Sequence, residues 1–435
     1  MYKTIKKKIA DKNAVIAVMG LGYVGLPIAL EFCKKGYSVI GLDNNKARVS
    51  KLRCGVSYVE DICSSEVASV AATGRFTATT DRKVLSKADI LIVCVPTPLR
   101  KTTEPDMSYI IDASITLAGR MRRGQLLIIE STTYPGTTRE VILPEIEKSG
   151  LVLDDDFFLA FSPERIDPGN PKYGLTNIPK VVGGLTPNST DLSRRIYSRI
   201  IREVIPVSSA ETAEVTKLLE NTFRIVNIGL INEFAMLCHK LGIDVWEVIK
   251  AAGTKPFGFM SFYPGPGIGG HCIPADPMYL SWKARTVGFR TEMIDLAAQI
   301  NRMIPEHVVN RTAALLKAGG RPAKGSKVMV IGAAYKKDVN DVRESPALEI
   351  INGLLSRKAS VRYHDPYIPA LMIGRKRMAS ASLTEGALKR QDIVLIVTDH
   401  RCLDYKLIAE NSRIVLDTRN VLESKGIRGK NIVKL

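Results

Sequence analysis

The seven cysteines of the chain include no Cys-x-x-Cys pair, and their odd number leaves at least one without an internal partner. Disulfide frameworks normally use even numbers, and structural zinc sites normally use closely spaced pairs, so we expect neither. The cysteines instead indicate a reducing compartment. We therefore expect a cytoplasmic protein with no bound metal, in which most cysteines are small buried hydrophobic residues.

A credible membrane span is also missing. Residues 14–30 carry no charge, but they contain three glycines and Pro27, and charged periodic sequence follows at once. This composition favours a buried strand, a turn and a helix start over a signal peptide or a membrane helix. We expect no membrane partner.

Acidic residues are scarce relative to basic ones, at 44 against 62, which gives a net charge of +18. The basic residues are dispersed, and no aromatic-interleaved basic patch, zinc finger or RNA-binding signature accompanies them. We therefore do not expect nucleic-acid binding. A solvated basic surface accounts for the charge, as does attraction of polyanionic small molecules such as dinucleotides and nucleotide sugars.

The first part of the chain carries a dinucleotide-binding pattern. An apolar strand at about 14–19 runs into Gly20-x-Gly22-x-x-Gly25, a helix follows, and the strand at 38–42 ends in Asp43. The glycines allow close backbone approach to a pyrophosphate, and the helix N-terminus receives its charge. A carboxylate at Asp43 can accept from a ribose 2′-hydroxyl and repel a 2′-phosphate, which favours NAD over NADP.

Each of the further apolar strands is followed by polar residues at its carboxyl end. They lie in "ADILIVCVPTP" (88–98), "QLLIIESTTYPGTT" (125–138) and "DFFLAFSPERIDPGN" (156–170). In an open parallel sheet, the carboxyl edge is where ligands bind.

The last third repeats this pattern, so the sequence predicts two doubly wound α/β domains. Its strands lie in "SKVMVIG", "ASVRYHDP", "QDIVLIVTDH" and "SRIVLDTRN". In place of the glycine fingerprint, the first turn has a longer loop with Lys336, Lys337 and Arg343. The loop could simply be solvated, but it leaves a strand end and enters a helix. We therefore favour a nucleotide site there that differs from the NAD site.

A single long helical pattern, 211–243, separates the two halves. Gly242 suits its end, and Asp244 can cap the next helix. Its wide apolar face predicts burial and a role in dimerisation. Lys217 and Asn221 lie four residues apart on one helical face, in mainly apolar surroundings, which favours a functional pair over a solvated one.

One thiol stands in an unusual context, "PGPGIGGHCIPADP" at 264–277, where four glycines surround Cys272. The glycines permit a loop with exposed N–H groups that presents the thiol to a ligand, although an irregular turn with an inert cysteine has the same composition. A nicotinamide cofactor with a nucleophilic thiol suggests oxidation of an alcohol to an aldehyde, its capture as a thiohemiacetal, oxidation to a thioester and hydrolysis. Such chemistry also needs oxyanion donors and carboxylates, and the candidates are Lys217, Asn221, Glu164 and Asp276.

At these residues the chain resembles the UDP-glucose/GDP-mannose dehydrogenase family over nearly its whole length. The shared motifs occur in the family's order: "GLGYVGLP", "VPTP", "ESTTYPGTT", "FSPERIDPGN", "EVTKLLENTFRIVNIGLINE", "GPGIGGHCIPADP" and "YKKDVNDVRES". The resemblance implies an NAD-binding Rossmann domain at 1–207, a helical dimerisation domain with the cysteine loop at 208–310, and a UDP-sugar-binding Rossmann-like domain at 311–435. It also implies a homodimer or a higher homo-oligomer.

The resemblance further assigns roles to individual residues. The implied catalytic residues are Cys272 as nucleophile, Lys217 and Asn221 at the oxyanion, and Glu164, Thr132 and Asp276 for water and protons. The implied NAD contacts are Gly20, Gly22, Tyr23, Val24, Gly25, Asp43, Arg48, Thr97, Thr132 and Arg343. The implied UDP-sugar contacts are Glu164, Arg165, Lys217, Asn221, Phe262, Tyr263, Gly265, Gly269 and Lys336.

Two motifs, "SPERIDPGN" and "GGHCIPADP", resemble the branch that oxidises UDP-N-acetylhexosamines, such as UDP-N-acetylglucosamine 6-dehydrogenases. UDP-glucose enzymes commonly carry an arginine upstream of the cysteine, and no arginine occurs from 225 to 284. The expected activity is therefore NAD-dependent, four-electron oxidation of a UDP-N-acetylhexosamine at C6, with UDP-N-acetylglucosamine first. The alternatives are UDP-glucose, the manno or galacto hexosamines, and a non-catalytic nucleotide sensor.

Overall fold

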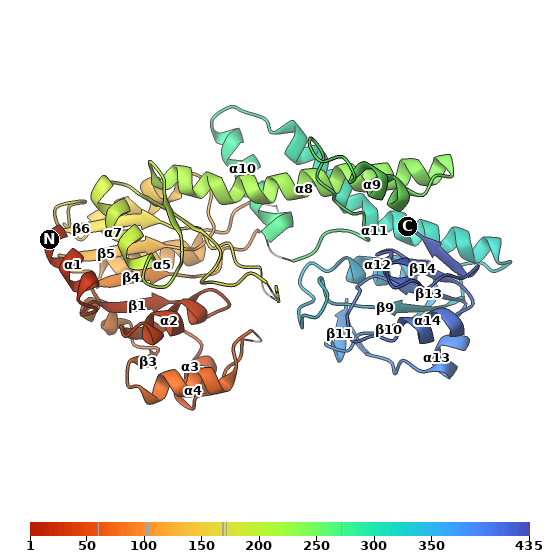
Figure 1. Cartoon of the computed structure of the whole chain (residues 1–435), viewed down its shortest axis with the longest axis horizontal. Helices are drawn as coiled ribbons and strands as arrows, with labels where there is room; N and C mark the ends of the chain where they lie inside the picture. The colour runs from red at the N-terminus through yellow and green to blue at the C-terminus, as the bar shows by residue number, and fades with distance from the viewer. Residues whose placement is uncertain (60, 101–103, 168, 171, 271) are drawn as a thin grey trace. The chain divides into compact units, whose positions relative to one another are not determined.

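The computed structural model describes residues 1–59, 61–100, 104–167, 169–170, 172–270 and 272–435 (Figure 1). The chain forms two compact units. The first comprises Met1–Glu220 and Met278–Phe289, and the second comprises Asn221–Pro277 and Arg290–Leu435. The predicted division into 1–207, 208–310 and 311–435 assigns domains by function and stays a prediction.

The first unit is built on an eight-stranded sheet in the order β3-β2-β1-β4-β5-β6-β7-β8. Neighbouring strands are parallel except β6 and β7, which are antiparallel. The strands are β1 (Val15–Met19), β2 (Ser38–Leu42), β3 (Phe76–Thr79), β4 (Ile90–Val93), β5 (Gln125–Ile129), β6 (Phe157–Phe161), β7 (Lys180–Gly184) and β8 (Val204–Pro206). The strands expected at 14–19 and 38–42 are confirmed, whereas the reversal at β7 was not predicted.

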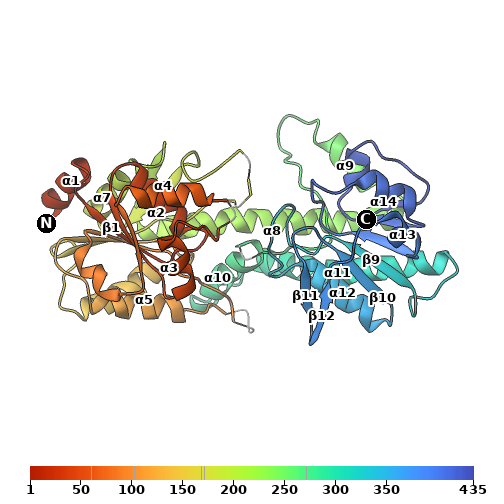
Figure 2. The same cartoon turned by 90° about the horizontal axis from the view of Figure 1, so that it is seen from below.

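Helices cover both faces of this sheet, as Figure 2 shows. They are α1 (Tyr2–Ala10), α2 (Gly25–Lys34), α3 (Lys46–Arg53), α4 (Ser64–Ala72), α5 (Ser108–Ala118), α6 (Leu143–Glu147) and α7 (Pro187–Tyr197), with short turns η1 (Arg82–Lys87) and η2 (Thr138–Ile142). Alternate residues of β1 enter different cores: Ile16 and Val18 pack in the cluster that includes α1, α2, α4 and α7, and Ala17 packs in the cluster that includes α5 and α6. Strands buried on both faces explain the uninterrupted apolar runs.

The second unit contains a parallel five-stranded sheet in the order β10-β9-β13-β14-β15 and a β11–β12 hairpin. The strands are β9 (Lys327–Ile331), β10 (Ser360–His364), β11 (Ala370–Ile373), β12 (Lys376–Ala379), β13 (Ile393–Ile396), β14 (Val415–Asp417) and β15 (Ile432–Lys434). The helices are α9 (Val245–Ala252), α11 (Glu292–Ala318), α12 (Pro346–Ser356), α13 (Glu385–Lys389), α14 (Tyr405–Asn411) and α15 (Val421–Ser424). The prediction of two doubly wound α/β folds is confirmed.

In both sheets, a buried carboxylate accepts hydrogen bonds from the turn that follows the first strand. In the first unit, Leu21 N–H donates to the buried carboxylate of Asp43, which follows β2. In the second unit, Ala333 and Ala334 N–H donate to the buried carboxylate of Asp365, which follows β10. Each carboxylate therefore fixes the turn that leaves its neighbouring strand.

Two helices contain residues of both units: α8 (Ala210–Leu241) and α10 (Cys272–Thr286). The long helix expected at 211–243 is α8, which ends just before Gly242 at a φ of +70°. The Asp244 side chain accepts from Trp246 N–H and caps α9, as predicted. Large apolar side chains of α8 are exposed in the single chain, so burial of that face depends on a partner and stays a prediction.

The prediction that most cysteines are buried is wrong. Cys33 and Cys238 are buried and Cys94 is half-buried, whereas the other four are exposed: Cys54, Cys63, Cys272 and Cys402. The exposed cysteines lie at helix ends or in loops, where apolar neighbours in the sequence do not ensure burial. Within the described part of the chain, no helix has the length and apolar character that crossing a membrane requires.

Candidate functional site

The glycine turn between β1 and α2 has the backbone that close approach to a ligand requires. Gly20 has a φ of +94°, and a Cβ there would lie 2.4 Å from the carbonyl oxygen of Cys94. A Cβ on Gly25 would lie 1.8 Å from the carbonyl oxygen of Gly20. At Gly22, by contrast, a Cβ would meet no atom of a residue beyond its neighbours in the chain within 4 Å, so this face of the turn is open. The turn therefore fits the pyrophosphate of a dinucleotide.

Asp43 lies beside this turn with acceptor capacity to spare. Its two oxygens accept from Leu21 N–H at 2.9 Å and Asn45 N–H at 2.8 Å, and Arg48 Nη1 lies 3.7 Å away. A carboxylate has about four lone-pair directions, so a ribose hydroxyl can still donate to it. Asp365, the equivalent carboxylate of the second unit, accepts five donors, because Tyr367, Ile368 and His400 join the two alanine N–H groups. The two units thus differ at the carboxylate that would accept from a ribose hydroxyl: Asp43 has spare acceptor capacity, whereas that of Asp365 is used within the protein.

The loop after β5 brings Thr132 and Lys217 together. The Lys217 ammonium donates to Thr132 Oγ1. Three residues earlier on α8, Glu214 accepts from Gly136 N–H at 2.6 Å and from Thr138 N–H at 3.0 Å. Burial raises the pKa of Glu214 to about 7. Sequence reasoning missed Glu214, although its place one turn before Lys217 on an apolar helix was a usable signal.

Glu164 is held at the carboxyl edge of the first sheet, in the loop after β6. One carboxylate oxygen, Oε1, accepts from Arg165 N–H at 2.6 Å and Ile166 N–H at 2.7 Å. The other, Oε2, lies 3.3 Å from Lys180 Nζ. The Arg165 guanidinium pairs with Glu220 at 2.6 Å and ties this loop to α8.

Thr97 lies in the loop after β4. Its carbonyl oxygen accepts from the Tyr279 hydroxyl at 2.8 Å, which anchors the loop to α10. Tyr279 is buried at 1% exposure. The first unit therefore gathers the loops after β1, β4, β5 and β6 at one edge of the sheet, where Glu164 contacts Lys180 and Thr132 contacts Lys217. That these residues act in catalysis stays a prediction.

In the second unit, Asn221 and Asp276 form a buried pair. Asn221 Nδ2 donates to Asp276 Oδ2 at 2.7 Å, and the two residues are 7% and 5% exposed. Cys272, one turn before Asp276 on α10, is exposed. The arrangement therefore combines an accessible thiol with a nearby helix turn that carries a fixed amide–carboxylate pair.

The glycine loop before Cys272 approaches protein more closely than was predicted. A Cβ on Gly269 would lie 2.7 Å from the Glu344 carbonyl oxygen, and a Cβ on Gly270 would lie 2.8 Å from the Tyr335 ring. Gly270 N–H donates to the Arg343 carbonyl oxygen at 3.2 Å. The expectation that these glycines expose their N–H groups is therefore wrong at Gly270. A larger residue than glycine would not fit at position 270, because this loop packs closely against the loop that follows β9.

Gly265 N–H likewise donates a hydrogen bond within the protein, to Asn232 Oδ1 at 3.0 Å. A Cβ on Gly265 would lie 2.8 Å from Arg419 Nη1, which places a half-buried side chain's guanidinium against the loop. Sequence reasoning missed Arg419, although it directly follows an apolar strand in "IVLDTRN". Phe262 packs edge-on against Phe223 at 5.6 Å, and Tyr263 stacks on Trp246 at 6.0 Å. Aromatic contacts thus fix the start of the loop.

The basic loop after β9 is strained as well as charged. Asp338 and Glu344 have φ values of +59° and +51°. Arg343 forms a bidentate ion pair with Asp341, with Nη2 2.6 Å from Oδ2. Lys336 is half-buried on the same loop. Positive φ at residues other than glycine is often found where function constrains the backbone.

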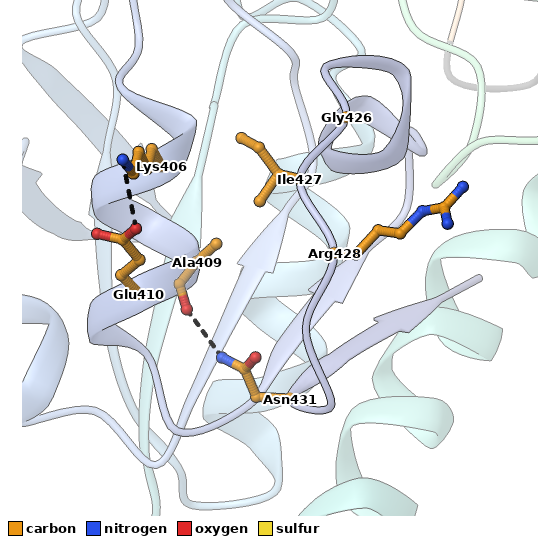
Figure 3. A pocket seen from close by; sticks show the side chains of 7 residues that line it. All are labelled: Lys406, Ala409, Glu410, Gly426, Ile427, Arg428 and Asn431. Carbon is orange, nitrogen blue, oxygen red and sulfur yellow. Dashed lines mark hydrogen bonds and ion pairs between the residues drawn. The ribbon is translucent and has the colours of Figure 1, made fainter.

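A cavity of about 600 Å³ opens elsewhere in the second unit, between α14 and the turn at 426–431 (Figure 3). Its lining residues are Lys406, Ala409, Glu410, Gly426, Ile427, Arg428 and Asn431. None of them belongs to the predicted site, so we do not assign this cavity to the reaction. Among the residues that the structure describes, no cluster of His, Cys, Asp or Glu is arranged to hold a metal ion.

Three models of one family match the chain in order. The UDP-glucose/GDP-mannose dehydrogenase family NAD binding domain matches residues 14–201, the central domain matches 211–303, and the UDP binding domain matches 329–424. The chain thus carries the family's NAD-binding domain at the glycine turn and its UDP-binding domain at the basic loop.

Similar proteins share the whole architecture but differ in substrate. A UDP-N-acetyl-D-glucosamine 6-dehydrogenase of Pseudomonas aeruginosa is 37% identical, over 82% of this chain and 84% of that protein. An NDP-N-acetyl-D-galactosaminuronic acid dehydrogenase of Ralstonia nicotianae is 33% identical over 95% and 97%. The solved structure of a UDP-D-ManNAc dehydrogenase from Pyrococcus horikoshii superposes with a TM-score of 0.87 at 33% identity, covering 97% of this chain and 98% of that one.

Proposed function

The chain belongs to the UDP-glucose/GDP-mannose dehydrogenase family, and on this basis we propose that it oxidises the C6 hydroxyl of a UDP-N-acetylhexosamine to a carboxylate. In the overall reaction, the sugar alcohol, two NAD⁺ and one water give the uronic acid, two NADH and two protons. The observation that carries the proposal is the exposed thiol of Cys272, which follows a glycine loop packed on the UDP-binding domain.

The first unit fits NAD through its own residues. The open face of Gly22 and the N-terminus of α2 would receive the pyrophosphate, and Asp43 would accept from the adenosine ribose. When bound, NAD supplies the oxidising equivalent for each of the two oxidation steps. The Thr97 loop and Thr132 would line the nicotinamide end, because they follow β4 and β5, the next strands along the same edge.

The chain's own residues would carry the covalent chemistry. After the first oxidation, Cys272 Sγ bonds to the aldehyde carbon and the carbonyl oxygen takes up a proton, giving a thiohemiacetal. Lys217 and Asn221 would donate to this oxygen as charge develops on it. Removal of the second pair of electrons leaves a thioester on Cys272.

Hydrolysis would complete the reaction. A water oxygen bonds to the thioester carbon, the C–S bond breaks, and the thiolate of Cys272 leaves. Glu164 would accept the water proton, because its carboxylate is fixed by backbone N–H groups at the sheet edge. Asp276 would hold Asn221 through its 2.7 Å hydrogen bond.

The second unit supplies groups suited to a uridine diphosphate. Arg419 presents a cation to the glycine loop, and Lys336 lies on the loop after β9 that packs against it. Phe262 and Tyr263 border the glycine loop. The lack of an arginine from 225 to 284 and the relatives that act on acetylated hexosamines support this substrate class over UDP-glucose.

We further propose that a second copy of the chain covers α8. Within the second unit, Leu230, Phe234, Leu237 and Leu241 recur at helical spacing and are 45–62% exposed. A contiguous apolar stripe of this kind is typical of an interface.

NADH formation tests the proposed activity directly. The purified chain is incubated with NAD and one of five substrates: UDP-N-acetylglucosamine, UDP-N-acetylgalactosamine, UDP-N-acetylmannosamine, UDP-glucose or GDP-mannose. We expect the highest kcat/KM with UDP-N-acetylglucosamine. NADH formation with UDP-glucose alone would overturn the substrate class, and nucleotide-sugar binding without NADH formation would indicate a sensor.

A further inference from the structure

A buried charged cluster lies behind Glu164 in the first unit. Lys180 Nζ lies 2.6 Å from Glu130 Oε2 and 3.3 Å from Glu164 Oε2. The lysine side chain is 4% exposed, and those of Glu130 and Glu164 are 0% and 9% exposed. The buried hydroxyl of Tyr197 donates to the other oxygen of Glu130.

The reversal of β7 explains why these groups meet. Glu130 directly follows β5, and Glu164 comes shortly after β6, its parallel neighbour, so both carboxylates emerge at one edge. Since β7 runs antiparallel to β6, with Phe161 opposite Gly183, its first residue starts at that same edge. That first residue is Lys180. The antiparallel pairing of β7 with β6 therefore brings a cation to two carboxylates.

Stability alone does not account for the cluster. Removing charged groups from water is expensive, and apolar side chains of similar volume often give a protein of equal or greater stability. A purely structural role would be met by such side chains. Because one member of the cluster is the proposed base, a role in controlling that base is the better explanation.

The contacts of Glu164 define its orientation. Arg165 and Ile166 N–H fix one oxygen, and Lys180 contacts the other. Both oxygens of the carboxylate are therefore held in place, one by backbone N–H groups and the other by a buried cation.

We propose that Lys180 is a positioning residue that orients the Glu164 carboxylate for thioester hydrolysis, and that Glu130, by holding Lys180, sets how firmly that orientation is kept. This proposal deepens the proposed function and rests on it. Neither Lys180 nor Glu130 would touch the sugar. Both would act through Glu164.

The charge of Glu130 determines the charge of the whole cluster. Burial, together with the charge of Glu164, raises the pKa of Glu130 to about 7, although Lys180 opposes the shift. The other titratable groups that face it are Tyr197 on α7 and Cys94 after β4, and burial raises the pKa of both well above their usual values, so they stay neutral. When Glu130 ionises, its carboxylate holds Lys180 by a buried ion pair, and protonation weakens that hold. Hydrolysis should therefore accelerate as the pH rises through about 7, because Lys180 then orients Glu164 more firmly.

The first test substitutes Lys180→Met and separates oxidation from hydrolysis. Rapid mixing with NAD and UDP-N-acetylglucosamine measures the burst of NADH, and intact-protein mass spectrometry measures the thioester on Cys272. We expect a burst of two NADH per site as in the wild type, a steady-state rate about 100-fold lower, and an accumulated thioester. A general loss of structure would lower the burst and the steady state together.

Lys8→Met is the matched control. Lys8 also pairs with a buried carboxylate of the first unit, with Nζ 2.7 Å from Asp89 Oδ1, but Asp89 precedes β4 and so lies at the opposite, amino edge of the sheet. We expect this variant to lose some thermal stability and to keep the wild-type ratio of burst to steady-state rate.

Glu130→Gln is the second variant, since it keeps the shape and the hydrogen-bonding atoms of the side chain. We expect the wild-type rise in hydrolysis rate near pH 7 to disappear, while the size of the burst stays the same.

The outcomes separate this proposal from the proposed function. An active wild type whose Lys180→Met variant hydrolyses the thioester at the normal rate, or whose Glu130→Gln variant keeps the same pH profile, overturns the positioning role alone. A wild type that forms no NADH with any nucleotide sugar overturns the proposed function and the positioning role together.

Discussion

Among the residues proposed for catalysis, Cys272 is exposed whereas Asn221, Asp276 and Glu164 are buried. The difference follows from their tasks. A nucleophile must reach a carbon of the substrate, whereas groups that orient a proton or an oxyanion gain strength from a fixed, partly dehydrated environment. The thiol also stands at the first residue of α10.

Cys272→Ser should abolish acid formation while leaving ligand binding near normal. A serine hydroxyl is hardly ionised at neutral pH, so capture of the aldehyde fails and the rate of acid formation should drop at least ~1,000-fold, about 4 kcal/mol of barrier. Calorimetry with NAD and with the UDP-sugar should give dissociation constants within about threefold of the wild type. Near-normal turnover of this variant would show that the cysteine has another role.

Asp43→Ala should narrow the preference for NAD over NADP. The change removes a carboxylate that accepts from the 2′-hydroxyl and repels a 2′-phosphate, and we expect the ratio of kcat/KM values to shrink roughly tenfold, about 1.4 kcal/mol. Asp81→Ala, at an exposed carboxylate that caps a short turn after β3, is the control and should leave the ratio unchanged. Equal use of both cofactors by the wild type would contradict the role of Asp43.

Single residues with a strong local pattern could be predicted, and those defined by long-range packing could not. Gly20, Asp43 and Asp244 take the places that their motifs require, because neighbouring residues in the sequence determine those places. Lys180 and Glu130 lie 50 residues apart and meet only because β7 reverses direction. Nothing in the sequence near Lys180 indicates that reversal.

At the scale of elements, the glycine loop before α10 packs against the UDP-binding fold and leads directly into the helix that begins at Cys272. Gly269 and Gly270 lie where a side chain would overlap Glu344 or Tyr335. The loop after β9 carries Lys336 and the strained residues Asp338 and Glu344. Because the two loops pack against each other, a change in one should alter the binding of a UDP-sugar at the other.

Gly270→Ala should therefore weaken both folding and sugar binding. The residue has a φ of +84°, and the new Cβ would lie 2.8 Å from the Tyr335 ring. Gly320→Ala is the matched control, since Gly320 has a φ of +78° but no atom within 4 Å. We expect the control to lose about 1 kcal/mol from backbone strain alone, and Gly270→Ala to lose about 1–3 kcal/mol more from overlap.

The kinetic effect separates these two variants further. KM for the UDP-sugar should rise in Gly270→Ala and stay unchanged in Gly320→Ala, while KM for NAD stays unchanged in both. Equal stability and equal KM values in the two variants would mean that the contact with Tyr335 is unimportant.

Helices and strands could be predicted from the sequence where the spacing of their apolar residues was clear. Strands buried on both faces, such as β5 and β13, appear as apolar runs, and α8 appears as a long 3.6-residue pattern. The packing of the glycine loop was not predictable, because glycines that admit a ligand and glycines that admit another loop have the same sequence pattern.

At the scale of the whole molecule, the chain combines an NAD-binding fold and a UDP-binding fold with a helix whose apolar stripe is exposed in the single chain. Leu237→Asp places a charge in the apolar stripe of α8. We expect this change to convert the proposed dimer into a monomer at micromolar concentration, as measured by light scattering. Met372→Asp is the control, because Met372 is 60% exposed on the β11–β12 hairpin, which is distant from α8 in the sequence. A wild type that is monomeric at that concentration would contradict the proposed interface.

The ratio of NADH formed to uronic acid formed tests the central claim most directly, because it counts the oxidation steps at one site. UDP-N-acetylglucosamine is converted to completion with excess NAD, NADH is measured by absorbance, and the acid and any aldehyde are measured by mass spectrometry. The proposed mechanism predicts two NADH for each uronic acid, with negligible free aldehyde, since Cys272 holds the intermediate until water releases the acid. One NADH for each sugar, with the aldehyde as the final product, would contradict it.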